Sequence, residues 1–245
     1  YSGRQNSRCA LHSGICVQDV TAGTVEIKNS RVMTGSSEPL TSRDYGVYVE
    51  NSHVFVSDTL FQNNGNGSST DYAFYASGAS SIISFVNNTI QDHNGYAMYI
   101  EPAYMSNVIS NTFSDTNNIN RVAIQGGTVP SGGTLRRQTN LEGFGLLGDL
   151  EVPSSVTWTL APGVTVMGRL NTEVLVRGDL QAVGLPTLPI TFTSADNSAP
   201  TQWSGLLFEG GGGRLQYVTV RYAGQNNSIF ENSNISIKDV TTREV

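Results

Sequence analysis

The sequence predicts an all-β protein, a parallel β-helix with three short strands per rung. Three observations carry this prediction: a strand-like phrase recurs three times, a similar lead-in precedes each copy, and apolar residues alternate with period two. The copies are YGVYVENS (45–52), YAFYASGAS (72–80) and YAMYIEPA (96–103). The lead-ins are VEIKNSRV (25–32), VFVSDTLF (54–61) and ISFVNNTI (83–90).

The length of the repeat decides which architecture it builds. Val25, Val54 and Ile83 are 29 residues apart, and the next equivalent position, Ser106, follows after 23 residues. A propeller blade needs about 40–45 residues, whereas a solenoid rung needs fewer. Such a rung holds two or three short strands, and each strand stacks on its copy at about 4.8 Å. We expect Val25, Val54 and Ile83 to line one inner column.

Polar residues recur where the second strand of each rung ends. They are Asn29, Asp58, Asn87 or Asn88, and Asn111. Side chains of this kind form hydrogen bonds with nearby backbone groups and favour tight turns. The sequence therefore predicts an Asn ladder that satisfies the backbone of successive turns.

The repeat style divides the chain into three parts. Residues 1–22 form a lead-in, residues 23–134 hold the rungs with the Asn ladder, and residues 135–245 follow a second style. In this last part the tripeptide GDL recurs 30 residues apart, at 148–150 and 178–180. Apolar alternation continues there, so we expect further rungs. We also expect the chain to be a piece of a longer protein whose coil continues.

These phrases resemble the right-handed parallel β-helix proteins, the pectate-lyase-like superfamily. GVYV corresponds to the first sheet of that fold, and VEIKN to the second sheet with Asn at the following turn. The phrases LAPGVTV, GDLQAVG, PITFTS and YVTVRYAG are similar to β-helix modules of large secreted or cell-surface bacterial and archaeal proteins. The resemblance implies a right-handed coil and an extracellular or cell-surface location. Many unrelated activities share this coil, so it implies no particular chemistry.

Composition narrows the range of partners. Only 14% of the 245 residues are charged and the net charge is −6, so we expect no nucleic-acid partner, which would require a basic surface. No apolar run approaches the roughly 20 residues of a membrane span, and none is expected here. We expect Cys9 and Cys16 to close a small disulfide loop; two reduced, buried thiols are the alternative.

Strand parity predicts which side chains of the first sheet point outward. One column of tyrosines is expected to form an outward ladder: Tyr48, Tyr75 and Tyr99. A second column is expected to fill the inner corner: Tyr45, Tyr72 and Tyr96. With Arg121 beside it, the outward ladder would bind sugars, because aromatic rings offer flat apolar faces. The alternative is a structural ladder in which each tyrosine stacks on its copies and is covered by the long loops 34–43 and 62–71.

Four carboxylates on the same face are candidates for chemistry: Asp44, Asp71, Glu50 and Glu101. Asp44 and Asp71 are expected one rung apart, about 5 Å, where two carboxylates can share a proton, bind Ca²⁺ or act as nucleophile and acid. Glu50 and Glu101 are expected about 10 Å apart, with Arg121 paired to Glu101. Pectate-lyase-like enzymes place catalytic and Ca²⁺-binding acids on this face. Their lyase and polygalacturonase motifs are absent here, and His93 is expected in a turn.

The sequence favours a non-catalytic extracellular β-helix module that serves as a surface or fibre scaffold, or as an adhesin that binds glycan, without a cofactor. The alternative is a polysaccharide lyase or glycoside hydrolase on the outer face of the first sheet, with Ca²⁺ as the cofactor its acids would hold. The expected partners are a polysaccharide or cell-surface glycan and further coil end to end, because open sheet edges invite strand addition.

Overall fold

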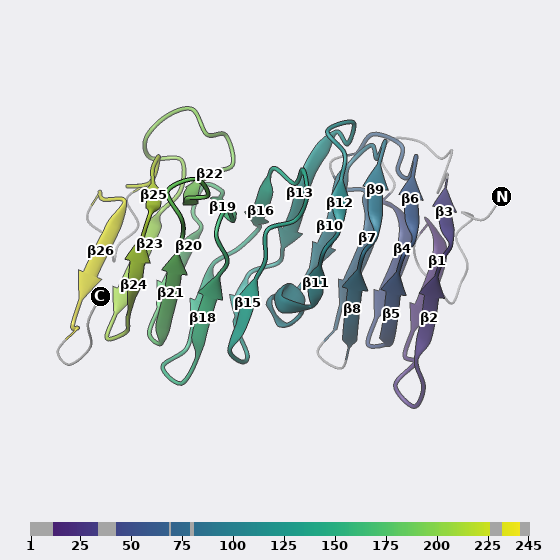
Figure 1. Ribbon diagram of the computed structural model, residues 1–245, viewed down its shortest axis with the longest axis horizontal. Coiled ribbons are helices and arrows are strands. Elements are labelled where there is room, and N and C mark those ends of the chain that lie inside the picture. The colour runs from purple at the N-terminus through teal and green to yellow at the C-terminus, as the bar shows by residue number, and fades with distance from the viewer. Residues whose placement is uncertain (1–11, 34–42, 69, 79–80, 226–231, 241–245) are drawn as a thin grey trace. The chain divides into compact units, whose positions relative to one another are not determined.

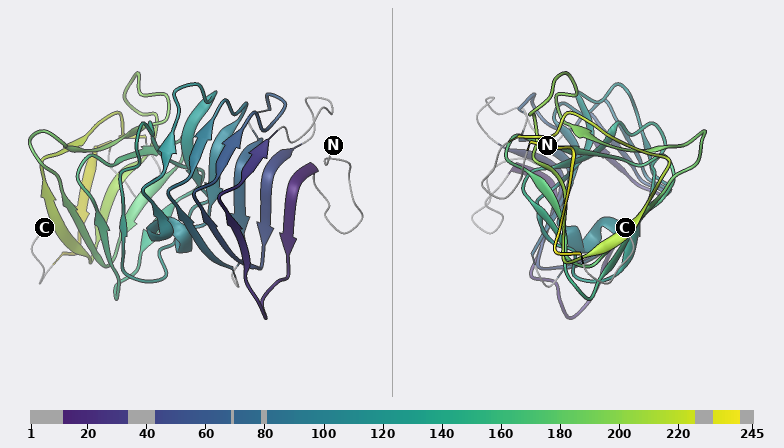
Figure 2. Two further views of the ribbon diagram at one scale, coloured as in Figure 1. Left: turned by 45° about the vertical axis from the view of Figure 1, so that its right-hand side comes forward. Right: turned by 90° about the vertical axis from the view of Figure 1, so that its left-hand side faces the viewer.

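The computed structural model describes residues 12–33, 43–68, 70–78, 81–225 and 232–240. This part of the chain is a right-handed parallel β-helix with three short strands per rung, as predicted (Figures 1 and 2). The chain divides into two compact units, residues 1–123 with 138–142 and residues 124–137 with 143–245. Each unit contains three parallel sheets.

The first unit holds four complete rungs and one further strand. Its first sheet has the order β1 (His12–Gln18), β4 (Asp44–Glu50), β7 (Tyr72–Ser77), β10 (Tyr96–Ile100) and β13 (Ile119–Ile124), whose last residue begins the second unit. The second sheet consists of β2 (Val25–Lys28), β5 (His53–Ser57), β8 (Ile82–Val86) and β11 (Val108–Ile109). The third consists of β3 (Arg31–Met33), β6 (Leu60–Gln62), β9 (Thr89–Gln91) and β12 (Thr112–Phe113).

The second unit repeats this plan. Its first sheet contains β16 (Gly143–Leu146), β19 (Thr165–Gly168), β22 (Ile190–Ser194) and β25 (Val218–Val220). The second contains β14 (Gly127–Thr128), β17 (Leu150–Val152), β20 (Glu173–Val176), β23 (Gly205–Glu209) and β26 (Ile235–Lys238). The third contains β15 (Gly133–Leu135), β18 (Thr157–Leu160), β21 (Asp179–Val183) and β24 (Gly212–Gln216).

Helix is scarce in the part of the chain that the structure describes. A short 3₁₀ helix, η1 (Pro102–Asn107), follows β10 in the first unit. No helix among the described residues has the length and apolar character needed to cross a membrane.

The strand register confirms the predicted inner column. Val25 pairs with Val54, and Val54 with Ile83. Val54 and Ile83 are buried, while Val25 at the first rung is half-buried. Phenylalanines pack beside this column, with the ring of Phe85 centred 4.8 Å from the ring of Phe74. The period-two apolar pattern therefore fills the inside of the coil.

A polar ladder is present at the predicted turn, but of the predicted residues only Asn88 and Asn111 belong to it. The recurring polar residues fall into two columns. One column ends the strands of the second sheet with positive φ: Asn29 (49°), Asp58 (51°), Asn87 (56°) and Ser110 (57°). The residue after each of them points into the turn. Asn and Asp adopt this left-handed conformation more readily than most residues, which explains their recurrence there.

The second column is the ladder itself. The amide of Thr59 donates to Asn88 Oδ1 (3.0 Å), and the amide of Asn88 donates to Asn111 Oδ1 (2.8 Å). The amide of Asn111 donates in turn to Gln138 Oε1 (2.9 Å). Each side-chain amide also donates to a strand carbonyl, as Asn88 Nδ2 does to Val56 O (3.1 Å). These buried side chains satisfy the backbone at the corner between the second and third sheets.

The GDL tripeptides of the second unit do not mark one rung repeat. Leu150 lies on β17 in the second sheet and pairs with Val174, whereas Leu180 lies on β21 in the third sheet and pairs with Trp158. The rungs of this unit vary in length, so equal spacing in sequence does not place residues in one column. What the two copies share is a glycine where neighbouring backbones approach closely. A Cβ at Gly148 would lie 2.9 Å from Gln125 O, and one at Gly178 would lie 2.1 Å from Pro153 O.

Candidate functional site

The outward tyrosine ladder exists, and its rings stack on one another. The ring centroids of Tyr48 and Tyr75 are 5.1 Å apart with an interplanar angle of 7°, and those of Tyr75 and Tyr99 are 4.3 Å apart at 12°. Both faces of the middle ring are therefore covered by neighbouring rings. What the ladder turns outward is a row of ring edges and hydroxyls.

The second tyrosine column does not point inward as strand parity predicted. The ring of Tyr45 contacts those of Tyr48 and Tyr75 edge-on, at 5.3 and 5.2 Å. The ring of Tyr72 lies 5.6 Å from that of Tyr75 and 5.3 Å from that of Tyr99. Tyr45, Tyr72 and Tyr96 also stack on one another, at 6.1 and 5.8 Å. Both columns thus lie on the outer face.

The alternation fails because two successive positions turn inward. Ala73 and Ala97 are fully buried, and a Cβ at the equivalent Gly46 would lie 3.0 Å from the side chain of Asn64 in a buried turn. The next position along each strand also faces the core, as Val47 does. Since small residues occupy the extra inward position, the preceding tyrosine swings to the outer face. The phrase Tyr–small–apolar–Tyr encodes this irregularity.

Burial governs the chemistry of the tyrosine hydroxyls. Tyr48 and Tyr75 are half-buried, and Tyr99 is 9% exposed. Burial raises the pKa of the Tyr48 and Tyr99 hydroxyls well above the usual range, and the nearby Glu50 and Tyr75 respectively add to these shifts. The hydroxyls therefore stay protonated and act as hydrogen-bond donors.

The three other candidates beside the ladder have protein partners. Glu50 accepts a hydrogen bond from Gln18 Nε2 (2.8 Å), and Glu101 Oε1 accepts one from the amide of Gly78 (2.7 Å). Arg121 forms two charge-assisted hydrogen bonds with Glu142, at 2.8 and 2.7 Å. Glu142, and not the predicted Glu101, is thus the ion-pair partner of Arg121.

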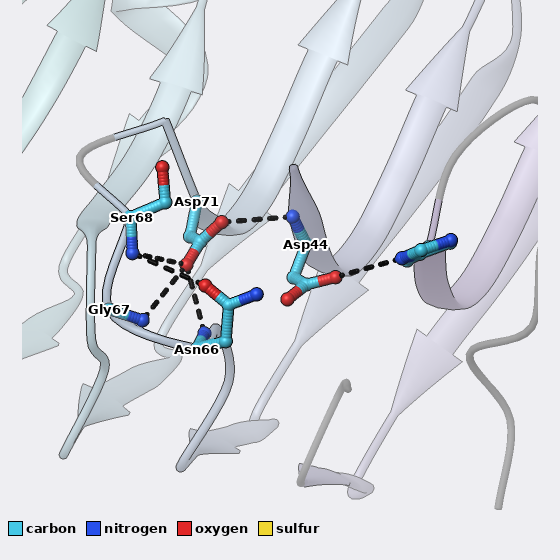
Figure 3. A network of polar contacts seen from close by, with 6 residues as sticks. Asp44, Asn66, Gly67, Ser68 and Asp71 are labelled. Atoms are coloured by element: carbon cyan, nitrogen blue, oxygen red, sulfur yellow. Dashed lines mark hydrogen bonds and ion pairs between the residues drawn. The ribbon is translucent and has the colours of Figure 1, made fainter. Parts of the chain in front are cut away.

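Asp71 anchors a loop through its carboxylate (Figure 3). Its Oδ2 accepts hydrogen bonds from the amides of Asn66 (2.9 Å), Gly67 (3.2 Å) and Ser68 (3.0 Å). Its Oδ1 accepts a fourth from the amide of Asp44 in the neighbouring rung (3.0 Å). Backbone amides therefore engage both oxygens of this carboxylate, and three of the four donors share Oδ2.

Asp44 lies next to Asp71 as the register predicted, but neither carboxylate faces solvent. Both residues are 0% exposed. His12 Nδ1 lies 3.4 Å from Asp44 Oδ1, and His12 itself is partly exposed. Strand parity places these acids on an outer face and does not show that they are buried. The signal for a covering loop is the run NNGNGSS before Asp71, within the loop 62–71 expected to cover the tyrosines, because Asn, Gly and Ser favour tight turns.

His93 lies in a turn, as predicted, within a second polar column at the corner between the third and first sheets. The column contains Asn64, His93 and Asn117. Asn64 Nδ2 donates to Val32 O (3.2 Å), and Asn117 Nδ2 donates to Ile90 O (3.0 Å). His93 replaces the amide at the middle position. Its ring is 1% exposed, and neither ring nitrogen has a hydrogen-bond partner.

Among the residues that the structure describes, no group of three or more His, Cys, Asp or Glu side chains could hold a metal ion.

Cys16 lies on β1 and is disulfide-bonded. Its predicted partner, Cys9, falls outside the described residues, so the Cys9–Cys16 pairing stays a prediction.

Comparisons of the chain with models of protein families, with curated proteins and with solved structures give no match. The arguments about function therefore rest on the residues themselves.

Proposed function

We propose that the chain is a non-catalytic extracellular scaffold module of the pectate-lyase-like type. One observation supports this most strongly: the carboxylate with the best position for chemistry, Asp71, is 0% exposed and accepts hydrogen bonds from four backbone amides. A nucleophile or Ca²⁺ ligand must be reached by the substrate or the ion, and a general acid must carry a proton to give. Asp71 instead holds a loop and ties two rungs together.

The tyrosine columns support the same function. Six rings pack on one another across three rungs of the first sheet, from Tyr45 to Tyr99. Aromatic pairs of this kind stabilise a sheet through contact between neighbouring strands. A scaffold that must hold its length outside a cell benefits from such contacts, because the coil has no other source of rigidity than rung stacking.

A substrate screen tests this proposal. The purified protein is incubated with a panel of acidic and neutral polysaccharides, with Ca²⁺ and with a chelator, and new reducing or unsaturated ends are measured. We expect none above the level of an Asp44→Asn, Asp71→Asn double variant. Turnover by the wild type that this variant loses would favour the alternative, a polysaccharide lyase or glycoside hydrolase.

Glycan binding is the second candidate, and the exposure of the ladder favours it. Tyr48 and Tyr75 are half-buried, so part of each side chain reaches solvent, and the Tyr48 hydroxyl is hydrogen-bonded to Glu50. A glycan would be held there by hydrogen bonds, since the faces of Tyr75 are already covered. Tyr75→Phe removes the hydroxyl and keeps the stack. On a glycan array, binding that this variant loses would establish the site, while an array without signal for the wild type would reject it.

Self-association end to end completes the proposal, because the last strand of a parallel coil offers unpaired backbone groups. Sedimentation over a range of concentrations tests it. We expect the mass to rise with concentration, and a strict monomer at every concentration would reject stacking.

A further inference from the structure

A buried histidine interrupts the polar column at the corner between the third and first sheets. The amide of His93 donates to Asn117 Oδ1 (3.1 Å), so its backbone follows the ladder. Its side chain does not, since both ring nitrogens are buried without a hydrogen-bond partner. An asparagine at this position would donate to a strand carbonyl, as Asn64 and Asn117 do on either side. The one polar group beside the ring is the backbone of Asp71, which favours the charged imidazole but forms no hydrogen bond of normal geometry with either ring nitrogen. A buried imidazole held so weakly is unfavourable for stability and calls for another role.

A short surface loop covers this histidine. We call residues 63–68 the flap. A Cβ at Gly65 in the flap would lie 3.2 Å from His93 Cε1 and 3.0 Å from Asp71 Oδ2, so the flap backbone lies directly against both side chains. Gly65 also has φ of +86°, and no larger residue could take this place without strain.

The contacts of the flap differ between its start and its tip. Asn64 is anchored to the coil, because its Nδ2 donates to Val32 O (3.2 Å) and its O accepts the amide of Asn94 (3.1 Å). Residues 65–68 form the tip: Asp71 Oδ2 accepts three of their amides, Asn94 Nδ2 donates to Gly65 O (3.1 Å), and the amide of Asp71 donates to Ser68 O (3.1 Å). The strands beneath it are held by parallel ladders between rungs, as β7 is with β4 and β10. The flap can therefore move away while the coil beneath keeps its hydrogen bonds.

The titratable groups nearest to His93 are carboxylates, and His12 lies beyond them, 3.4 Å from Asp44 Oδ1. Asp71 lies across Gly65 from the ring, and Asp44 bonds to Asp71 through its backbone amide. Asp92 precedes His93 in the same turn and accepts a hydrogen bond from Gln62 Nε2 (3.0 Å). None of these nearest groups would repel a charge on the imidazole, so desolvation under the flap is what opposes protonation.

We propose that the flap is an acid-opened cover: when His93 takes up a proton, the flap moves away and exposes His93, Asp71 and Asp44, while the rungs beneath stay wound. The charged imidazole needs water, and the flap is what excludes water from it. Acidification is thereby converted into a new polar surface on the module.

The direction of the pH dependence follows from linkage. Burial lowers the pKa of His93 from 6.5 to about 4, and the backbone of Asp71 opposes the shift. A group with a depressed pKa in the closed state is neutral there and charged in the open state between these two values. The ratio of open to closed flap therefore rises as pH falls through 6.5, by at most about tenfold per pH unit, and by roughly 300-fold in total between neutral pH and a pH well below 4.

Hydrogen exchange tests the proposal on the whole protein. Exchange of the amides of residues 66–68, corrected for the intrinsic rate, is measured by mass spectrometry at pH 6.5 and 4.5, with peptides from β5 and β8 as internal reference. We expect the flap amides to exchange about 40-fold faster at pH 4.5, with the reference strands little changed. The matched variant His93→Asn should remove this pH dependence, and His53→Asn, on β5, should keep it.

Two results would overturn the proposal. One is flap exchange that does not change with pH in the wild type. The other is exchange that rises equally in the flap, β5 and β8, which would indicate unfolding of the coil. If His93→Asn does not fold, His93→Gln is used for the same comparison. An imidazole NMR titration of the wild type then provides a second test, and we expect it to give a pKa of His93 well below 6.5.

Discussion

The two units build the corner between the second and third sheets in different ways. Between the second and third sheets the first unit places a buried amide, Asn88, whose side chain bridges neighbouring rungs. At this corner the second unit places Gly178, where a Cβ would lie 2.1 Å from Pro153 O and 2.3 Å from Val156 O. One unit fills the corner with a side chain, and the other removes the side chain so that backbones touch.

The difference teaches how two repeat styles can build one fold. In the first unit the turn backbone is satisfied by side chains, so the corner tolerates a wider spacing and selects Asn, Thr and Gln. In the second unit backbone groups pair directly, as when the amides of Arg177 and Gly178 both donate to Val152 O at 2.9 Å. Such close approach selects glycine. The comparison predicts that each unit is sensitive to a different kind of substitution.

The largest effect is expected from Asn88→Ala. The change removes the acceptor of the Thr59 amide and the donor to Val56 O, and it leaves these buried groups without partners. We expect the unfolding free energy of the first unit to fall by about 3–4 kcal/mol in urea denaturation. Asn118→Ala removes an exposed amide from the same unit and should change stability by less than about 1 kcal/mol. Equal losses in the two variants would contradict the ladder account.

Gly178→Ala is the matched change in the second unit. The new methyl group would overlap two carbonyl oxygens of the neighbouring rung, and we expect a loss of about 2–3 kcal/mol. Gly145→Ala serves as control, because a Cβ at Gly145 would meet no atom within 4 Å. Denaturation followed by the fluorescence of Trp158 and Trp203 reports on this unit alone. A neutral Gly178→Ala would show that the second unit does not depend on backbone contact.

A smaller effect is expected from the tyrosine stack, which only the first unit has. Tyr75→Ala removes a half-buried ring with a neighbour on each face, and we expect a loss of about 2 kcal/mol. Tyr75→Phe keeps the stack and should lose about 0.5 kcal/mol. Thermal unfolding of both variants decides whether the ring or the hydroxyl contributes. If Tyr75→Ala and Tyr75→Phe lose the same amount of stability, the hydroxyl and not ring stacking stabilises the tyrosine column.

The smallest effect is expected from the ion pair of Arg121 with Glu142. The arginine side chain is 19% exposed and that of the glutamate 46%, so water and salt screen their attraction. Arg121→Met should lower stability by about 0.5–1 kcal/mol, and the loss should shrink in high salt. A loss that is independent of salt would assign the effect to packing of the arginine stem.

The fold could be predicted from sequence because its signals are local and repeated. The 29-residue spacing of Val25, Val54 and Ile83 and the Asn at each turn follow from rung stacking and left-handed turns, and both are confirmed. The orientation of Tyr45 and Tyr72 could not be predicted, because one extra inward residue shifts every side chain before it. In the second unit the two GDL tripeptides are spaced as a rung repeat would be but lie in different sheets, because the rungs there differ in length.

The sequence predicted the positions of Asp44 and Asp71 but not their burial. The register brings Asp44 and Asp71 together as expected, but burial depends on how residues 63–68 fold over them, which no strand pattern encodes. Similarly, the partner of Arg121 is Glu142, 21 residues further along, and this pairing depends on a return of the chain after the third sheet. Long-range closure of this kind is invisible to alternation and repeat length.

The stability of Asp71→Asn tests most directly whether these outer groups hold the coil together. The substitution replaces one carboxylate oxygen by an amide donor that faces backbone donors, so at least one of four hydrogen bonds is lost. The account predicts a fall in unfolding free energy of about 2–4 kcal/mol, and no effect of Ca²⁺ or a chelator on the wild type. A variant with unchanged stability that loses Ca²⁺ binding or polysaccharide turnover would contradict the account.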